Sequence, residues 1–167
     1  DKMEPLNKAH NIFIDTATGK LYVFSPKFYP TGVSTLAVFN LDHPENPVVE
    51  ELYNELGSMH DGFVRDGILF ANAGMEGLFM LDVSDLENIH IIGSLTTYPD
   101  QDYNHAGWLN DDGDIYVFAD ERHGMALKVA DVSDPTDIDV LSTIHSGVDS
   151  NSIPHNVILK GDFAYIS

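Results

Sequence analysis

The stretch that decides the fold is "HAGWLNDDGDIYVFAD", residues 105–120. It holds two apolar runs on either side of a polar turn that contains Gly113. The runs alternate and are rich in Ile, Val, Phe and Tyr, which is typical of antiparallel strands. Glycine can adopt the positive φ that a tight hairpin requires. The stretch therefore predicts a β-hairpin that begins directly after His105.

The same pattern occurs four times along the chain. The four histidines that open it, His10, His60, His105 and His155, are spaced by 50, 45 and 50 residues. The other three copies read "HNIFIDTATGKLYVF" at 10–24, "HDGFVRDGILFAN" at 60–72 and "HNVILKGDFAYIS" at 155–167, with Gly19, Gly67 and Gly161 in their turns. A fixed period of this length indicates a repeat architecture.

A second pattern lies between the histidines and consists of a strand, a polar turn and another strand. Its copies read "LAVFNLDHPENPVV" from Leu36, "LFMLDVSDLENIHII" from Leu78 and "LKVADVSDPTDIDVL" from Leu127. Asn40, Asp82 and Asp131 occupy the same position in the three copies. We expect their side chains to accept hydrogen bonds from nearby backbone amides and so shape the turn.

One repeat therefore spans about 45–50 residues and four short strands, as in a β-propeller blade. A β-sandwich would not explain the long repeat, and the repeats of a β-helix are shorter. We predict an all-β chain in which residues 1–167 form a single β-propeller region of four-stranded antiparallel blades, starting near 10, 60, 105 and 155. About three and a half blades are present, so we expect either a longer protein or several copies that complete the ring.

Composition excludes several classes of function. Asp and Glu total 27 against 8 Lys and Arg, a formal net charge of −19, which disfavours nucleic acid and anionic membranes and attracts cations. The absence of cysteine excludes disulfides, thiolate metal sites and cysteine nucleophiles. No apolar run is long enough to span a bilayer, and no P-loop, GxGxxG or GxSxG motif occurs.

The order of these motifs resembles the LVIVD-repeat propellers, in particular the bacterial surface proteins of the choice-of-anchor B family. The most specific match is "NHAGWLNDDGDIYVFADE", residues 104–121, and "DVSDLENI" and "DVSDPTDI" look like the turns that close the blades of that family. The resemblance covers essentially the whole chain. It implies a secreted or surface-held bacterial propeller, often with a separate C-terminal anchor, and assigns no activity.

The histidines are the candidate metal ligands. Equivalent positions of successive blades lie at the same radius and height, so His10, His60, His105 and His155 should converge at one mouth of the central channel. Convergent imidazoles bind iron, copper or zinc, and added carboxylates extend the range to manganese or calcium. Asp61 and Asp120 are candidate supporting ligands, and Glu121 could also add a carboxylate ligand. Asp120 and Glu121 are the only candidates for a catalytic base.

A structural role is the alternative for the four histidines, since each could bond a backbone carbonyl of the next blade and join the ring. His43, His90, His123 and His145 fall outside the register and are expected on the surface or in loops. Trp108, the single tryptophan, is expected to pack between blades.

Three functions remain open. The first is a secreted or cell-surface binding or structural module with a histidine-lined metal site and an extracellular ligand. The second is a metal-dependent oxidoreductase or hydrolase with its ion at the channel mouth. The third is a self-assembling structural subunit, whose open blade edges join further copies of the chain.

Overall fold

The computed structural model describes residues 6–30 and 32–167, and the chain is all-β. Three four-stranded antiparallel sheets follow the three complete repeats, each with its strands paired in chain order. The first sheet contains β2 (Asn11–Asp15), β3 (Lys20–Phe24), β6 (Leu36–Asn40) and β7 (Val48–Tyr53). The second contains β8 (Asp61–Arg65), β9 (Ile68–Asn72), β10 (Leu78–Asp82) and β11 (His90–Leu95). The third contains β12 (Asn104–Leu109), β13 (Ile115–Asp120), β14 (Leu127–Asp131) and β15 (Asp139–Ile144).

The remaining elements are small. The fourth histidine opens a two-stranded hairpin of β16 (Val157–Lys160) and β17 (Phe163–Ile166). The long connection between β3 and β6 carries β4 (Lys27–Phe28) and β5 (Gly32–Val33), which pair with β1 (Leu6–Lys8) in a three-stranded sheet that the repeat pattern did not predict. A single 3₁₀ turn, η1 (Leu86–Asn88), follows β10. Within the described residues no helix has the length and apolar character needed to cross a membrane.

The turns confirm the two sequence patterns. The four hairpin glycines all have positive φ: Gly19 at +66°, Gly67 at +77°, Gly113 at +86° and Gly161 at +55°. The amides of Asp42, Ser84 and Ser133 donate to Asn40, Asp82 and Asp131 over 2.6, 2.9 and 3.0 Å, as the turn chemistry predicted. Hydrogen bonds from the hydroxyls of Ser84 and Ser133, and then from their amides, lower the pKa of Asp82 and Asp131.

The three sheets also share a β-bulge, an irregularity in the strand pairing, at the same position. The pairing between the third and fourth strands shifts at Val38/Phe39, at Met80/Leu81 and at Val129/Ala130, each time two residues after the strand begins. A bulge increases local twist and bends the strand. The three sheets therefore share their curvature as well as their strand order.

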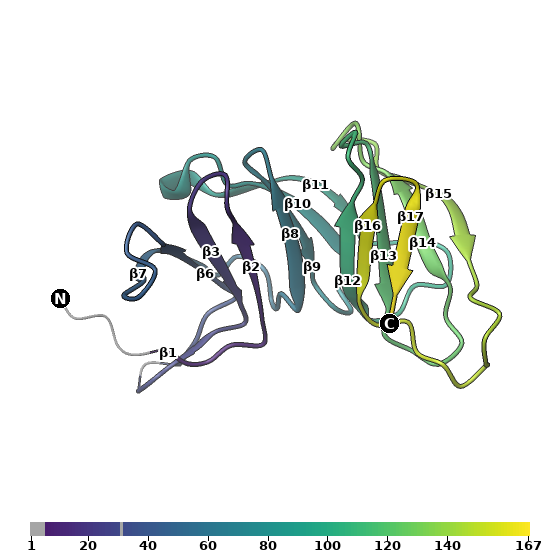
Figure 1. Cartoon of the computed structure of the whole chain (residues 1–167), viewed down its shortest axis with the longest axis horizontal. Coiled ribbons are helices and arrows are strands. Elements are labelled where there is room, and N and C mark those ends of the chain that lie inside the picture. Colours follow the sequence, from purple (N-terminus) through teal and green to yellow (C-terminus); the bar gives the residue numbers. More distant parts are fainter. Residues whose placement is uncertain (1–5, 31) are drawn as a thin grey trace.

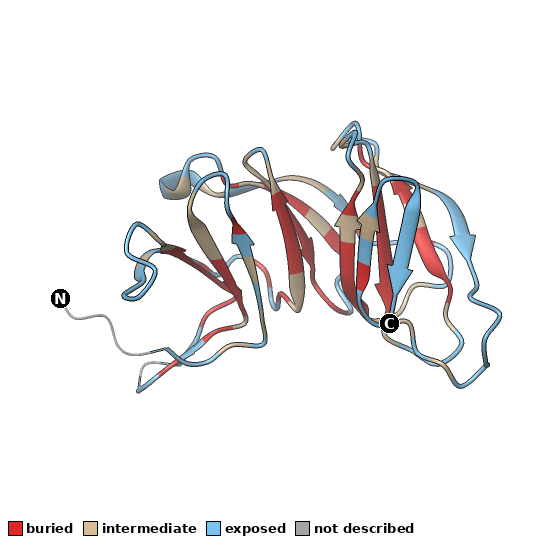
Figure 2. Ribbon diagram, in the orientation of Figure 1, coloured by how far each residue is buried: buried red, intermediate tan, exposed pale blue. Residues whose placement is uncertain are grey.

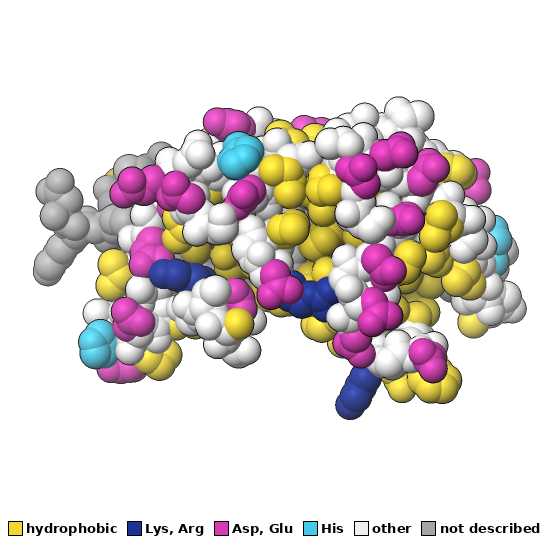
Figure 3. All heavy atoms as spheres, turned by 90° about the horizontal axis from the view of Figure 1, so that it is seen from above, with side chains coloured by type: hydrophobic (Ala, Val, Ile, Leu, Met, Phe, Trp, Pro, Cys, Tyr) yellow, Lys and Arg dark blue, Asp and Glu magenta, His cyan; other side chains and the backbone are white. Residues whose placement is uncertain are grey.

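The sheets stand side by side, with their first strands together. β2 contacts β8, β8 contacts β12, and β12 contacts β16 (Figure 1). Buried residues concentrate along β8, β9, β12 and β13, whereas β15 and β17 are largely exposed (Figure 2). Figure 3, seen from above, shows hydrophobic side chains between the sheets, bordered by many acidic groups. The described sheets form an open series and do not close into a barrel.

The apolar core lies between neighbouring sheets. Phe24 and Leu36 of the first sheet share one cluster with Leu69 and Leu81 of the second. Phe70 of the second sheet stacks on Tyr116 of the third with ring centroids 4.9 Å apart. Trp108 is half-buried, and its ring lies 4.8 Å from that of Phe63 in the second sheet, so it packs between sheets as expected. Contact across the interfaces, more than within one sheet, gives the chain its core.

The contact between β11 and the third sheet can be tested at Gly93. A Cβ there would lie 2.1 Å from the carbonyl oxygen of Pro135, a backbone atom that cannot move alone. We expect Gly93→Ala to lower the free energy of unfolding by about 1–3 kcal/mol through overpacking, measured by urea denaturation. Ser94→Ala, at an exposed position of the same strand, is the control and should change it by less than about 0.5 kcal/mol.

Candidate metal centre

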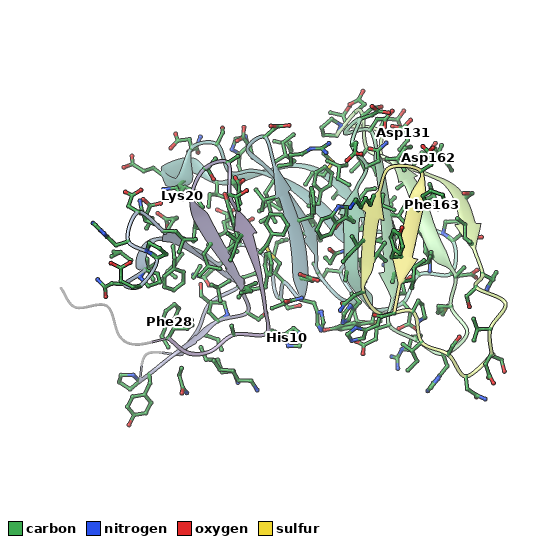
Figure 4. All side chains as sticks on the ribbon, in the orientation of Figure 1. His10, Lys20, Phe28, Asp131, Asp162 and Phe163 are labelled. Atoms are coloured by element: carbon green, nitrogen blue, oxygen red, sulfur yellow. The ribbon has the colours of Figure 1, made fainter. Side chains whose placement is uncertain are left out.

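The four register histidines lie at one edge of the sheets. The amides of His10, His60 and His155 donate to Phe24, Asn72 and Ser167, which hold the same place opposite each first strand, over 3.0, 2.7 and 2.9 Å. His105 lies inside β12, beside the bulge between Asn104 and Ala106. Figure 4 shows His10 at the lower edge, at the opposite end of the first sheet from Lys20. Because the first strands pack together, these four side chains meet.

The imidazoles form a continuous row. Ring centroids are 3.9 Å apart between His10 and His60, 4.2 Å between His60 and His105, and 4.1 Å between His105 and His155. Burial differs strongly along it: His105 is 3% exposed and His60 is half-buried, whereas His10 and His155 at the two ends are exposed. The two central rings, of His60 and His105, are therefore shielded from solvent. The rings of His10 and His155 are separated from each other by these two.

Three residues in the middle offer ligand atoms to one point. One donor atom each from His60, His105 and Glu121 lies within 4.8 Å of the other two, and no other such group occurs among the described residues. Nε2 of His105 lies 3.5 Å from one carboxylate oxygen of Glu121, and Nε2 of His155 lies 3.7 Å from the other. Two ligands bonded to one tetrahedral ion at ~2.1 Å are roughly 3.4 Å apart. The spacing of His105 and Glu121 therefore suits a shared ion.

The protonation state of the central histidines also suits a metal. Burial, followed by the neighbouring His60 and His155, lowers the pKa of His105 to about 3. Burial and then His10 lower the pKa of His60. Both rings are thus neutral near pH 7, which is the form that binds metal ions.

The Nδ1 atoms of His60 and His105 are buried and have no hydrogen-bond partner. A backbone group of the next histidine along the row raises the pKa of each ring, although burial lowers it by more. This is the kind of contact that the structural alternative predicts, and it leaves both Nδ1 atoms without a partner. A buried polar atom left unpaired costs about 1–3 kcal/mol, so both atoms call for an explanation. An ion bound to Nδ1 of His60 would supply one. His105 faces Glu121 with Nε2, so an ion there would leave its Nδ1 unpaired.

Of the acids singled out in the sequence, Glu121 joins this group, while Asp61 and Asp120 lie outside it. Asp120 is fully buried and accepts hydrogen bonds from Lys128 Nζ at 2.6 Å and Tyr98 Oη at 2.9 Å. Its carboxylate is already paired, so Glu121 is the better candidate for a ligand. The sequence offered Glu121 as a carboxylate ligand or a general base and did not rank it above Asp61 or Asp120 as a ligand, because it has no counterpart in the other repeats.

The surroundings of the row include one aromatic ring that sequence reasoning did not place. Tyr103 lies edge-on to His60 with centroids 5.2 Å apart, and its carbonyl accepts a hydrogen bond from the Glu121 amide at 2.9 Å. The out-of-register histidines, His43, His90, His123 and His145, are all exposed, as expected. They lie outside the donor group.

The sequence matches no protein-family model, and no similar curated protein is found. The geometry of the site is therefore the basis for inferring its function.

The buried ion pair beside the site can be tested at Lys128. Lys128 and Asp120 are both 0% exposed, so removal of the ammonium group leaves an uncompensated buried carboxylate. We expect Lys128→Met to lower the free energy of unfolding by about 3–5 kcal/mol in urea denaturation. Lys160→Met, which removes an exposed lysine of β16, should leave it almost unchanged, and equal effects of the two substitutions would contradict this account.

The half-buried Asp61 predicts a pH-dependent effect on stability. Burial raises its pKa from 3.8 to about 6, so the native state keeps the proton at a pH where the unfolded state has released it. This contribution to stability is full below about pH 3.8 and is lost as the pH rises through 6. In metal-free protein, Asp61→Asn should therefore raise the free energy of unfolding by about 1–2 kcal/mol at pH 7 and hardly at all at pH 3.5. The exposed Asp112→Asn is the control. A gain of equal size at both pH values would argue against a buried carboxyl.

Proposed function

We propose that this chain is part of a secreted or cell-surface bacterial β-propeller that binds a divalent transition-metal ion through His60, His105 and Glu121. The observation that carries the proposal is the convergence of these three donors in the protected middle of the row. The unpaired Nδ1 of His60 and the neutral state of both imidazoles support it. The extracellular location rests on the family resemblance and on the net charge of −19, which suits a saline or external setting.

The propeller is supported by four-stranded sheets that share strand order, bulge position and contact between first strands. Its first sheet also presents a face that fits another blade. Ile12 and Ile14 of β2 are 51% and 50% exposed, whereas Gly62 and Val64, their equivalents in β8, are buried against the preceding sheet. About three and a half blades are present, and further blades of the same protein or further copies of the chain would cover such faces.

The donor set narrows the choice of metal. Two imidazoles and one carboxylate suit zinc, iron, copper or manganese, whereas calcium requires six to eight oxygen ligands. Neutral histidine also binds these borderline ions without a thiolate, and the chain has no cysteine. Calcium is therefore the least suitable of the ions that the sequence left open.

A metal-dependent enzyme is the second candidate, and the number of ligands favours it. Three protein ligands leave a fourth position for water or substrate, as in catalytic zinc sites, whereas structural zinc sites have four protein ligands. The side chain of Glu121 is 35% exposed and that of His155 46%, so the site is accessible from solvent on that side. In this alternative Glu121 is a ligand, and an additional group would have to act as the base.

Metal binding is tested by elemental analysis of protein equilibrated with zinc, iron, copper or manganese and then freed of loosely bound ions. We expect about one ion per chain in the wild type, and its loss when His60→Ala and His105→Ala are combined. The matched control combines His90→Ala and His145→Ala, which removes two exposed histidines outside the row. Equal metal content in all three proteins would overturn the proposal.

If an ion is bound, the cobalt-substituted protein separates the binding module from the enzyme. Azide should change its visible spectrum where a coordination position is open, and a closed site should not respond.

A further inference from the structure

A series of buried polar side chains crosses the interface between the second and third sheets. We call it the buried polar network, and its members are Tyr116, Asn72, Asn104, Tyr98, Asp120 and Lys128. Tyr98 is 8% exposed and the other five are 0% exposed. Polar groups are rarely buried in such number at an otherwise apolar interface unless each is paired. This network is paired from one end to the other.

Its hydrogen bonds link the two sheets directly. Asn72 of β9 donates to Asn104 of β12 over 2.6 Å and accepts from Tyr116 Oη over 2.9 Å. Asn104 donates to Tyr98 Oη over 3.3 Å, and that hydroxyl donates to Asp120 over 2.9 Å. The backbone of Asn104 also exchanges two hydrogen bonds of 3.0 Å with Gly74. Asn104 is therefore fixed to the second sheet by both its side chain and its main chain.

Two donors of the proposed metal site directly follow a network member in the chain, and the third is hydrogen-bonded to one through its backbone amide. Asn104 directly precedes His105, and Asp120 directly precedes Glu121. The amide of His60 donates to the carbonyl of Asn72 over 2.7 Å. The three ligand-bearing segments are thus held in place by side chains that are themselves bonded to one another.

The network belongs to this interface and is absent from its register equivalent in the first sheet. Phe24 pairs with Asn11 there, in the place that Asn72 holds opposite Asp61. The equivalent pair of the third sheet is Ala106 and Ala119, one step from Asn104 and Asp120. An apolar ring therefore replaces the polar side chain, and His10 at that sheet is exposed. A purely structural repeat would give every interface the same residues.

We infer that Asn72, Asn104 and Asp120 are positioning residues that pre-organise His60, His105 and Glu121 for a single metal ion. The inference rests on the proposed metal-binding function and places the centre of the site at these three residues, with His10 and His155 outside it. Groups behind the direct ligands set ligand orientation, and their loss typically costs about 10–100-fold in metal affinity. Fixing the segments in the free protein also reduces the ordering that binding would otherwise require.

The test compares Asn104→Leu with Leu81→Ala in the full chain, using Co²⁺ as the probe. Both substitutions disturb a fully buried position between sheets, but only Asn104 contacts the network. We expect Asn104→Leu to weaken Co²⁺ binding about 10–100-fold and to change the visible Co²⁺ spectrum, which reports ligand geometry. Leu81→Ala should lower the unfolding temperature while affinity and spectrum stay as in the wild type.

Tyr98→Phe provides a second variant should Asn104→Leu not fold. It removes only the hydroxyl that joins Asn104 to Asp120, and we expect a smaller change of the same kind in affinity and spectrum. Unchanged Co²⁺ affinity and spectrum in the folded network variants, with lower unfolding temperatures, would show a structural network and overturn this inference alone. A wild type that binds no Co²⁺, zinc, iron, copper or manganese would overturn the proposed function as well.

Discussion

Contact between the first strands β2, β8, β12 and β16 sets the distance between neighbouring sheets, and the position of every register histidine depends on that distance. The approach is close at Gly62, where a Cβ would lie 2.9 Å from the ring of Phe24 in the preceding sheet. A larger residue would push the second sheet away from the first. The ring centroids of neighbouring imidazoles at this edge are then only 3.9–4.2 Å apart, because the strands beside them are in contact.

The same packing produces unequal environments from equivalent residues. His60 and His105 each have a neighbour in the row on both sides, which removes water and keeps the rings neutral. His10 and His155 have only one neighbour each within the described chain and remain exposed. Each repeat contributes one imidazole, and the place of the repeat in the row of sheets determines whether that imidazole is buried or exposed. The electrostatic character of the site is thus a property of the assembled sheets more than of the histidine motif.

Much of the fold could be predicted because its determinants are local and repeated. Gly113 and its three equivalents mark the hairpins, Asp82 and Asp131 mark the second kind of turn, and the spacing of the histidines predicts that they meet. The small sheet of β1, β4 and β5 was not predicted, since it occurs once and its strands have two or three residues. The role of Asn72, and the preference for Glu121 over Asp61 and Asp120 as a ligand, could not be predicted from the sequence for another reason. The partners of Asn72 and Glu121, which are Asn104 and His105, lie 32 and 16 residues away, and neither residue repeats in the other sheets.

Residues that recur in every repeat and residues that occur in only one have different roles in this chain. Residues that recur, such as the hairpin glycines, meet a requirement that every unit has, so they mainly build the scaffold. Asn72, Asn104, Asp120, Glu121 and Lys128 break the repeat, and all lie at or beside the one interface where the histidines are most buried. Burying an ion pair such as Lys128 and Asp120 rarely adds net stability compared with an apolar pair, so stability alone does not account for its placement. A requirement for fixed geometry beside His60 and His105 does account for it, because rigid pairing of buried polar groups orients the segments that bear them.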